Sequence, residues 1–222
     1  MEILIVSATA AEIEPVEKLL NAQWIGSSPG TFTRGNCTVR LLVSGIGMHR
    51  MAFTLGQVFT SLNPGLCINI GMAGAFPGRC EIGEVVHVTS ERIIDLGAED
   101  GHGRFLGIAA MDLDEDISSI SGLLNKDAAQ YSFLRSVKGI TANTSHGSSD
   151  SIQVIVKDWE PDVESMEGAA FFYCCMKANV PFLEIRAISN LVEPRNKANW
   201  NIPLALNNLS SQIIEILNFF VS

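Results

Sequence analysis

Short apolar runs alternate with segments of helical periodicity along most of the chain. Five runs have the length and composition of strands, and several are apolar enough for a sheet buried on both faces: 2–6, 38–44, 66–71, 84–89 and 182–189. Apolar positions three and four residues apart predict four helices, at 10–21, 48–62, 167–178 and 202–221. Asn201 and Pro203 suit the start of the last helix. Strands that alternate with helices predict a mostly parallel, right-handed α/β sheet, in one domain over residues 1–222.

Composition narrows the class of protein and of partner. The chain has 222 residues, of which 47% are hydrophobic and 18% charged, and this fits a compact core. A net charge of −9 without a lysine or arginine cluster argues against a nucleic-acid partner, because phosphate binding needs a basic face. No apolar run approaches the length of a membrane span, so we expect no membrane partner.

Cysteine and histidine usage bears on the compartment and on metals. The five cysteines are an odd number without a CxxC pair, and the start "MEILIV" lacks the basic region of a signal peptide. We therefore expect reduced thiols and a cytoplasmic location. The four histidines form no HExxH or HxH pair, so neither a metal nor another cofactor is expected.

Polar and glycine-rich stretches follow several predicted strands or lead into a helix. They are "SATAAE" (7–12), "SGIG" (44–47), "GMAGAF" (71–76), "ESMEG" (164–168) and "SN" (189–190). Ligands of open α/β sheets bind beyond the carboxyl ends of the strands. Together these stretches predict a pocket of carboxylates and amides, which is a poor phosphate site and a good site for a neutral polyol.

Each of these stretches also has a simpler structural interpretation. Glu12 and Glu167 could each stabilise a helix start, and the glycines of "GMAGAF" could serve a tight turn or close strand–helix packing. Ser189 and Asn190 could form an ordinary turn or N-cap. Neither glycine stretch matches GxGxxG or a P-loop, so no motif supports a dinucleotide or nucleotide phosphate site.

Six motifs occur in a fixed order along the chain: "SATAAE", "SGIGMHR", "NIGMAGAF", "HGSSD", "ESMEGAAFFY" and "EIRAISN". In this order the chain resembles the purine nucleoside phosphorylase/nucleosidase superfamily, and most of all its hydrolase branch, which includes methylthioadenosine/S-adenosylhomocysteine nucleosidase. More narrowly, "ESMEGAAFFY" followed by "RAISNLVEPRNKANWNIPLALNNL" resembles the futalosine hydrolases of the futalosine route to menaquinone. The resemblance implies a three-layer α/β fold with a mixed, partly barrel-like central sheet flanked by helices. It also implies a homodimer or larger homo-oligomer.

The resemblance implies roles for three residues at the sugar. Met166 and Glu167 would line the ribose, with Glu167 accepting hydrogen bonds from the vicinal hydroxyls. A carboxylate suits a diol because it only accepts hydrogen bonds and has two oxygens. Glu12 would be the base that activates water. A phosphorylase would bind anionic phosphate there, and a carboxylate would repel it, so hydrolysis is favoured.

At the purine, the resemblance singles out Asn190. The adenine-cleaving nucleosidases have aspartate at this position. The asparagine carbonyl can accept from a protonated ring nitrogen 7 and its amide can donate to a 6-oxo group, so hypoxanthine is the expected leaving group. A neutral amide does not itself supply the proton for that group. The other substrate-binding residues implied by the resemblance are Met72, Ala73 and Gly74 through their backbone, Ile152 packed on the base, and Ser189.

Three other functions stay open at this point. An adenine-directed nucleosidase acting on methylthioadenosine/S-adenosylhomocysteine or on aminodeoxyfutalosine is disfavoured by Asn190, and a phosphorylase by the lack of a basic pair near Glu12. A purine-nucleoside-binding relative without turnover is the third. For the carboxyphenyl tail of futalosine, the sequence offers only candidates: Arg195, Asn196 and Trp200.

Overall fold

The computed structural model describes residues 1–102, 105–111, 123–125 and 134–221. The strands of the central sheet are β1 (Glu2–Ser7), β2 (Ile25–Ser28), β3 (Thr31–Arg34), β4 (Cys37–Val43), β5 (Leu66–Ala75), β6 (Val85–Glu91), β9 (Leu123–Leu124), β10 (Ser136–Thr141), β11 (Val163–Ser165) and β12 (Phe182–Leu191). The strands β7 (Gly97–Glu99) and β8 (Phe105–Gly107) form a separate small hairpin. The helices are α1 (Ala10–Gln23), α2 (Met48–Val58), α3 (Ser149–Trp159), α4 (Gly168–Ala178) and α5 (Ile202–Phe220), with 3-10 turns η1 (Ile108–Met111) and η4 (Lys197–Asn199).

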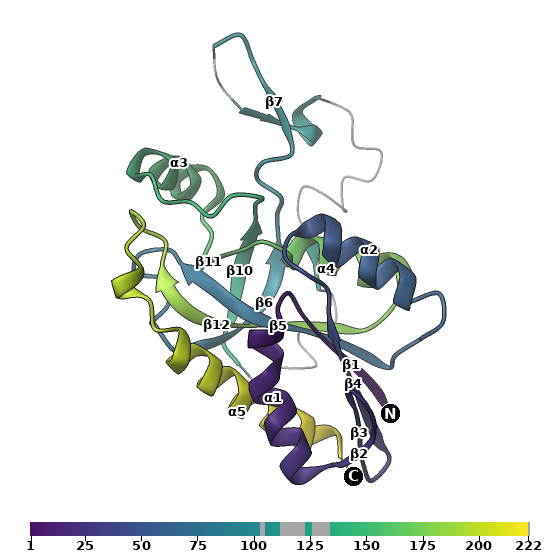
Figure 1. Cartoon of the computed structure of the whole chain (residues 1–222). Helices are drawn as coiled ribbons and strands as arrows, with labels where there is room; N and C mark the ends of the chain where they lie inside the picture. Colours follow the sequence, from purple (N-terminus) through teal and green to yellow (C-terminus); the bar gives the residue numbers. More distant parts are fainter. Residues whose placement is uncertain (103–104, 112–122, 126–133, 222) are drawn as a thin grey trace.

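Part of the central sheet closes on itself. The strands pair in the ring β5–β12–β6–β10–β11 and back to β5, and β1, β4, β3 and β2 extend from β5 as an open sheet. The β12–β6 and β11–β5 pairs are antiparallel, whereas β1, β4 and β12 run parallel to their neighbours around β5. The predicted mixed, partly barrel-like sheet is therefore confirmed (Figure 1).

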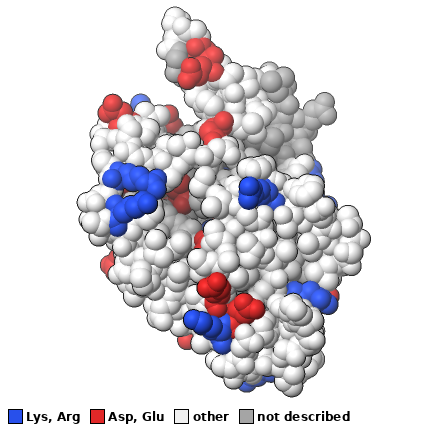
Figure 2. Space-filling model, in the orientation of Figure 1, with Lys and Arg blue, Asp and Glu red and all other residues white. Residues whose placement is uncertain are grey.

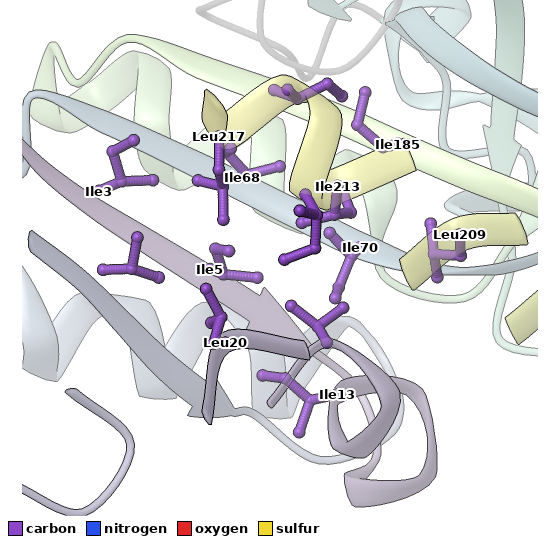
Figure 3. Close-up of a cluster of buried hydrophobic side chains, with 14 of the residues drawn as sticks. Ile3, Ile5, Ile13, Leu20, Ile68, Ile70, Ile185, Leu209, Ile213 and Leu217 are labelled. Atoms are coloured by element: carbon purple, nitrogen blue, oxygen red, sulfur yellow. The ribbon is translucent and has the colours of Figure 1, made fainter. Parts of the chain in front are cut away.

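Helices cover the two faces of the sheet. This explains why the sequence of strand β1 is almost entirely apolar. Ile3 and Ile5 point into the cluster that α1 and α5 cover, where they meet side chains such as Leu20 and Leu217 (Figure 3). Leu4 and Val6 point into the cluster that α2 and α4 cover. Because successive side chains of a strand face opposite ways, two covered faces require a continuous apolar run. Within the described residues, no helix is both long enough and apolar enough to cross a membrane.

The sequence pattern missed several short elements and misplaced some boundaries, since the strand predicted at 66–71 continues to Ala75. The predicted helix at 48–62 ends at Val58, and α3, β10, β11 and the β2–β3 hairpin were not predicted. Strand β2 is exposed along its whole length, so it has no buried apolar pattern. Helix α3 does have apolar residues at helical spacing, since Ile152, Val156 and Trp159 lie on the side that packs on a hydrophobic cluster, and the prediction overlooked this short stripe.

The glycines of "GMAGAF" lie inside β5 and not in a turn after it, so the tight-turn interpretation is wrong. A methyl group on Gly71 would lie 2.9 Å from both Glu12 Oε1 and Arg186 Nη1, and one on Gly74 would lie 3.2 Å from Asn190 Nδ2. The missing side chains thus let polar groups of α1 and β12 approach the strand closely.

Candidate active site

A cavity of about 310 Å³ lies at the carboxyl ends of β1, β5 and β12, beside β11. This is the edge where the sequence predicted a pocket. Its lining consists of Ala8, Thr9, Glu12, Ile46, Met72, Ala73, Gly74, Ser145, Glu164, Ser165, Met166, Glu167, Ser189, Asn190 and Trp200. Figure 2 shows a hollow on this face with acidic atoms inside it and a basic patch beside it.

Glu12 is held from two directions at the start of α1. Its Oε2 accepts hydrogen bonds from the Thr9 backbone N–H (2.9 Å) and the Thr9 hydroxyl (2.8 Å). Its Oε1 accepts from the Met72 N–H of β5 at 3.1 Å. The helix-start interpretation of Glu12 is therefore correct, but the carboxylate can still accept a further hydrogen bond. Each carboxylate oxygen has about two acceptor sites, so Oε1 keeps one that can take a proton from water.

Glu167 occupies the N-cap position of α4, yet its side chain does not cap that helix. Its Oε1 instead accepts a 2.8 Å hydrogen bond from the Gly47 N–H, at the start of α2. Burial raises the pKa of the Glu167 carboxyl, while the Arg186 charge and the Gly47 and Met166 N–H groups oppose that shift and Glu12 adds to it. Glu167 thus does not cap α4 but holds the start of α2, and its second oxygen, Oε2, remains able to face a ligand.

Asn190 and Ser189 lie at a β-bulge near the end of β12. The register of β12 against β5 shifts between Ile188 and Asn190, and Asn190 then pairs with Gly74. Bulges often re-aim a side chain next to an active site. The Asn190 Oδ1 accepts from the Ser189 hydroxyl at 2.8 Å, and its Nδ2 donates to the Leu191 carbonyl at 2.9 Å. One acceptor site and one N–H of the amide remain for a ligand.

The structure brings together all but one of the residues that the resemblance assigns to the ribose, the water and the purine. Glu12, Met72, Ala73, Gly74, Met166, Glu167, Ser189 and Asn190 line the one cavity. Ile152 does not belong to this lining. It is buried in a hydrophobic cluster with Phe76 and Val192, and the structure does not place it against a ligand in the cavity.

Sequence reasoning missed other lining residues. Thr9 was detectable, because Thr9 and Glu12 have the S/T-x-x-E spacing of a capping box. Glu164 lies in the stretch "ESMEG", but nothing local indicates a role for its carboxylate. It is buried, and it accepts a 3.0 Å hydrogen bond from the His146 N–H and a further bond at the His146 Nδ1.

A buried polar cluster lies behind the cavity. Arg186 Nη2 lies 2.8 Å from Glu184 Oε1, and its Nη1 donates to Asn69 Oδ1 at 3.0 Å. A methyl group on Gly168 would lie 2.4 Å from Glu91 Oε1 and 2.6 Å from Glu184 Oε1, so both carboxylates face the start of α4. Burial raises the pKa of Glu184 to about 7 and that of Glu91 well above its usual range, and repulsion between the two adds to the shift of Glu91.

The cavity mouth is formed partly by the segment that joins β12 to α5. Trp200 lines the cavity, and the Arg195 guanidinium lies over its ring at 5.3 Å from the centroid. Asn196 has a structural role there, since its side chain accepts from the Ala198 N–H at 3.1 Å and caps η4. The basic patch in Figure 2 lies over this segment, whose positive charges are Arg195 and Lys197.

Comparison with known proteins agrees with this geometry. A family model described as the phosphorylase superfamily matches residues 2–218. The chain belongs to the phosphorylase superfamily. It is 31% identical to a futalosine hydrolase of Thermus thermophilus over 79% of this chain and 80% of the relative, and 30% identical to one of Acidothermus cellulolyticus over 93% and 86%. A 5'-methylthioadenosine/S-adenosylhomocysteine nucleosidase of Psychromonas ingrahamii is 27% identical over 81% and 80%.

Solved structures of superfamily members confirm the fold. The native futalosine hydrolase of Helicobacter pylori superimposes with a TM-score of 0.79 at 16% identity, covering 99% of this chain and 98% of that one. The nucleosidase of Neisseria meningitidis in complex with methylthio-immucillin-A gives a TM-score of 0.75 at 18% identity, covering 98% and 99%. The resemblance drawn from the six motifs is thus confirmed.

Proposed function

We propose that this protein is a nucleosidase that hydrolyses the N-ribosidic bond of futalosine, releasing hypoxanthine and dehypoxanthine futalosine in menaquinone biosynthesis. One observation carries the proposal: a single cavity holds Glu12, which keeps an acceptor site for water, and Glu167, which keeps an oxygen for a diol. Three relatives that are 27–31% identical are named futalosine hydrolase, and these names support the choice of substrate.

The sugar end of the cavity suits hydrolysis through an oxocarbenium-like ribose. Glu167 accepts hydrogen bonds from the vicinal hydroxyls, and these bonds replace the water that its buried carboxylate lacks. Met166 lies beside it in the lining and packs against the sugar. The substrate diol thereby favours the ionised form of a carboxyl whose pKa burial has raised.

Glu12 takes a proton from the attacking water. Its three hydrogen-bond donors fix the carboxylate in place, and fixed groups lose little free energy to reorganisation during the reaction. Among the described residues that line the cavity there is no lysine or arginine, while Glu12, Glu164 and Glu167 all belong to the lining. Anionic phosphate would be repelled from such a site, so water is the acceptor of the ribosyl group.

At the purine end of the cavity, Asn190 recognises the base. Its remaining acceptor site takes the N–H at ring nitrogen 7, and its remaining amide hydrogen donates to the 6-oxo group of hypoxanthine. Gly74 lies directly under the amide, so the base approaches the backbone of β5 closely. A 6-amino group would face a donor where it needs an acceptor, and the adenine-releasing alternative is disfavoured for that reason.

The mouth of the cavity recognises the carboxyphenyl tail. Trp200 offers an aromatic ring to the phenyl group, and the Arg195 guanidinium over that ring offers a positive charge to the carboxylate. The chain is otherwise acidic, with a net charge of −9, so a basic patch at this point favours an anionic tail.

A direct assay tests the proposal. Purified protein is incubated with futalosine, with and without phosphate, and free hypoxanthine and the sugar product are measured. We expect equal rates in both conditions and a free reducing sugar. A strict need for phosphate with a ribose 1-phosphate product would show a phosphorylase, and faster cleavage of methylthioadenosine or aminodeoxyfutalosine would return the chain to the adenine-releasing branch.

The proposal also includes the state of the protein in the cell. We infer one domain over residues 1–222, a cytoplasmic location, and a homodimer or larger assembly. Light scattering on the purified protein measures the assembly, and a monomeric mass at micromolar concentration would contradict it.

A further inference from the structure

The reaction needs a proton that Asn190 does not carry. When the bond between the sugar and purine nitrogen 9 breaks, the electron pair of that bond passes into the purine, which leaves readily only if nitrogen 7 is protonated. A neutral amide can accept and donate hydrogen bonds, but it has no acidic proton to give. Another group at the purine end must hold it.

Glu164 lies across Gly74 from Asn190. Gly74 of β5 pairs with Asn190 on one side and with Glu164 of β11 on the other. Residues directly opposite in neighbouring strands project to the same face, and two strand spacings separate the two outer residues by about 10 Å. Gly74 contributes no side chain between them, and all three line the cavity. The Glu164 carboxylate and the Asn190 amide therefore flank the same space.

His146 shares a hydrogen bond with that carboxylate. The His146 backbone N–H donates to Glu164 Oε1 at 3.0 Å, and the ring Nδ1 is hydrogen-bonded to Oε2. Glu164 is buried and His146 is only partly so, which leaves a route for exchange with solvent. The hydrogen bond to Glu164 raises the pKa of His146 against the opposing effect of burial, and the charges of Glu164 and Asp95 add to the rise. The backbone of Arg195, in the segment that joins β12 to α5, lies close to Gly147.

We propose that the Glu164–His146 pair is the proton donor for the departing purine. The inference rests on the proposed function, and it names the group that the neutral Asn190 makes necessary. The proton between His146 Nδ1 and Glu164 Oε2 moves to purine nitrogen 7 as the bond from the sugar to nitrogen 9 breaks. Water forms the new bond to the sugar carbon and gives its proton to Glu12. Solvent then returns a proton to the exposed side of His146.

A purely structural role for the pair makes a different prediction. The two hydrogen bonds tie the segment before α3 to β11, and loss of such a tie would loosen the cavity for every substrate. Figure 1 shows where α3 and β11 lie. Loss of a proton donor harms only leaving groups that need protonation, and it changes the pH dependence of turnover.

The experiment compares Glu164→Gln, His146→Asn and the parent on two substrates. Futalosine loses a base that needs a proton, whereas 4-nitrophenyl β-ribofuranoside loses a stable anion. We expect both variants to cleave futalosine about 10²-fold more slowly, which is the lower range for general acid catalysis, and the nitrophenyl riboside at close to the parent rate. His102→Asn is the matched control, because His102 is exposed and lies outside the cavity lining. Near-ultraviolet circular dichroism checks the fold of each variant.

The pH profile gives a second readout on futalosine alone. In the parent, kcat falls as pH rises and the pair loses its proton. In His146→Asn this fall moves to lower pH, and in Glu164→Gln it disappears. Equal losses on both substrates, or an unchanged pH profile in a folded His146→Asn variant, would overturn the inference.

Failure of the proposed function looks different. A parent that releases no hypoxanthine from futalosine refutes that function, and the same variants are then compared on whichever purine nucleoside the parent does cleave. A parent that cleaves none overturns both conclusions.

Discussion

The two helices that begin at the cavity hold their glutamates in different ways. At the start of α1, Glu12 accepts three hydrogen bonds, from Thr9 and Met72. At the start of α4, Glu167 does not cap its own helix, whose first N–H groups donate to Ser165 and Thr141. It accepts from Gly47 instead, with a pKa that burial has raised. The hydrogen bonds of Glu12 are made within the protein, whereas Glu167 keeps acceptor sites that a ligand would fill. Glu12 is preorganised for chemistry, and Glu167 is preorganised for recognition.

The first prediction removes the preorganised base. Glu12→Gln should lower kcat by about 10²-fold or more, because general base catalysis contributes 10²–10⁴-fold. KM for futalosine should stay close to that of the parent, since the amide keeps the shape of the carboxylate. Steady-state kinetics of hypoxanthine release measure both constants. Glu14→Gln is the control, on an exposed position of the same helix. A variant with parental kcat would show that Glu12 serves only the helix start.

The second prediction removes the acceptor that the ligand completes. Glu167→Gln should cost about 2–4 kcal/mol in kcat/KM, because a charge-assisted contact that tightens in the transition state is lost. Thermal unfolding should change little, since the amide oxygen of Gln can still accept from the Gly47 N–H. A variant that melts earlier but keeps full activity would reverse the contrast with Glu12 and make Glu167 a structural residue.

The third prediction concerns the purine end. Parent protein should prefer futalosine over aminodeoxyfutalosine by roughly 10²-fold, because the wrong base leaves a buried polar group unpaired and water compensates only in part. Asn190→Asp should erode or reverse this preference without changing the ribose contacts. The measurement is kcat/KM for both substrates on both proteins. Equal efficiency of the parent on the two substrates would mean that Asn190 does not discriminate between them.

The fourth prediction addresses the buried cluster behind the two glutamates. The pKa of Glu184 is raised to about 7 in the folded protein by burial, against the opposing charge of Arg186. A raised folded pKa contributes stability that is fully present below the unfolded pKa and is lost as pH rises through about 7. The free energy of unfolding of the parent should therefore fall by about 3 kcal/mol between acidic and alkaline conditions.

Glu184→Gln should remove most of that fall, because an amide has no proton to lose. Urea unfolding at several pH values measures it, and Glu14→Gln at an exposed position is the control. An unchanged pH dependence in the variant would assign the effect to Glu91, the other buried carboxylate of the cluster.

The sequence predicted the elements with long apolar patterns and the residues that follow them in motifs. The five long strands and four of the helices were found, and Glu12, Glu167 and Asn190 do line one cavity. What it could not predict depends on contacts between distant residues. The bond from Gly47 to Glu167 spans 120 positions, and Glu164 becomes part of the site only because β11 closes the ring against β5. No local pattern records such pairings.

The last and smallest expected effect lies at the mouth, where the ligand again completes the site. Arg195→Met should lower kcat/KM for futalosine by about fivefold, because an exposed ion pair contributes little even when a Trp200 contact holds the guanidinium. Lys197→Met removes a charge from the same segment without removing the stacked guanidinium, so it separates a specific contact from general attraction. The loss with Arg195→Met should disappear for a futalosine methyl ester, whose tail carries no charge, and should shrink at high salt. If both variants lose the same amount of kcat/KM on futalosine itself, the basic patch attracts the carboxylate of the tail only through general electrostatic attraction. In that case the mouth, unlike the starts of α1 and α4, holds no group at a fixed position for the ligand.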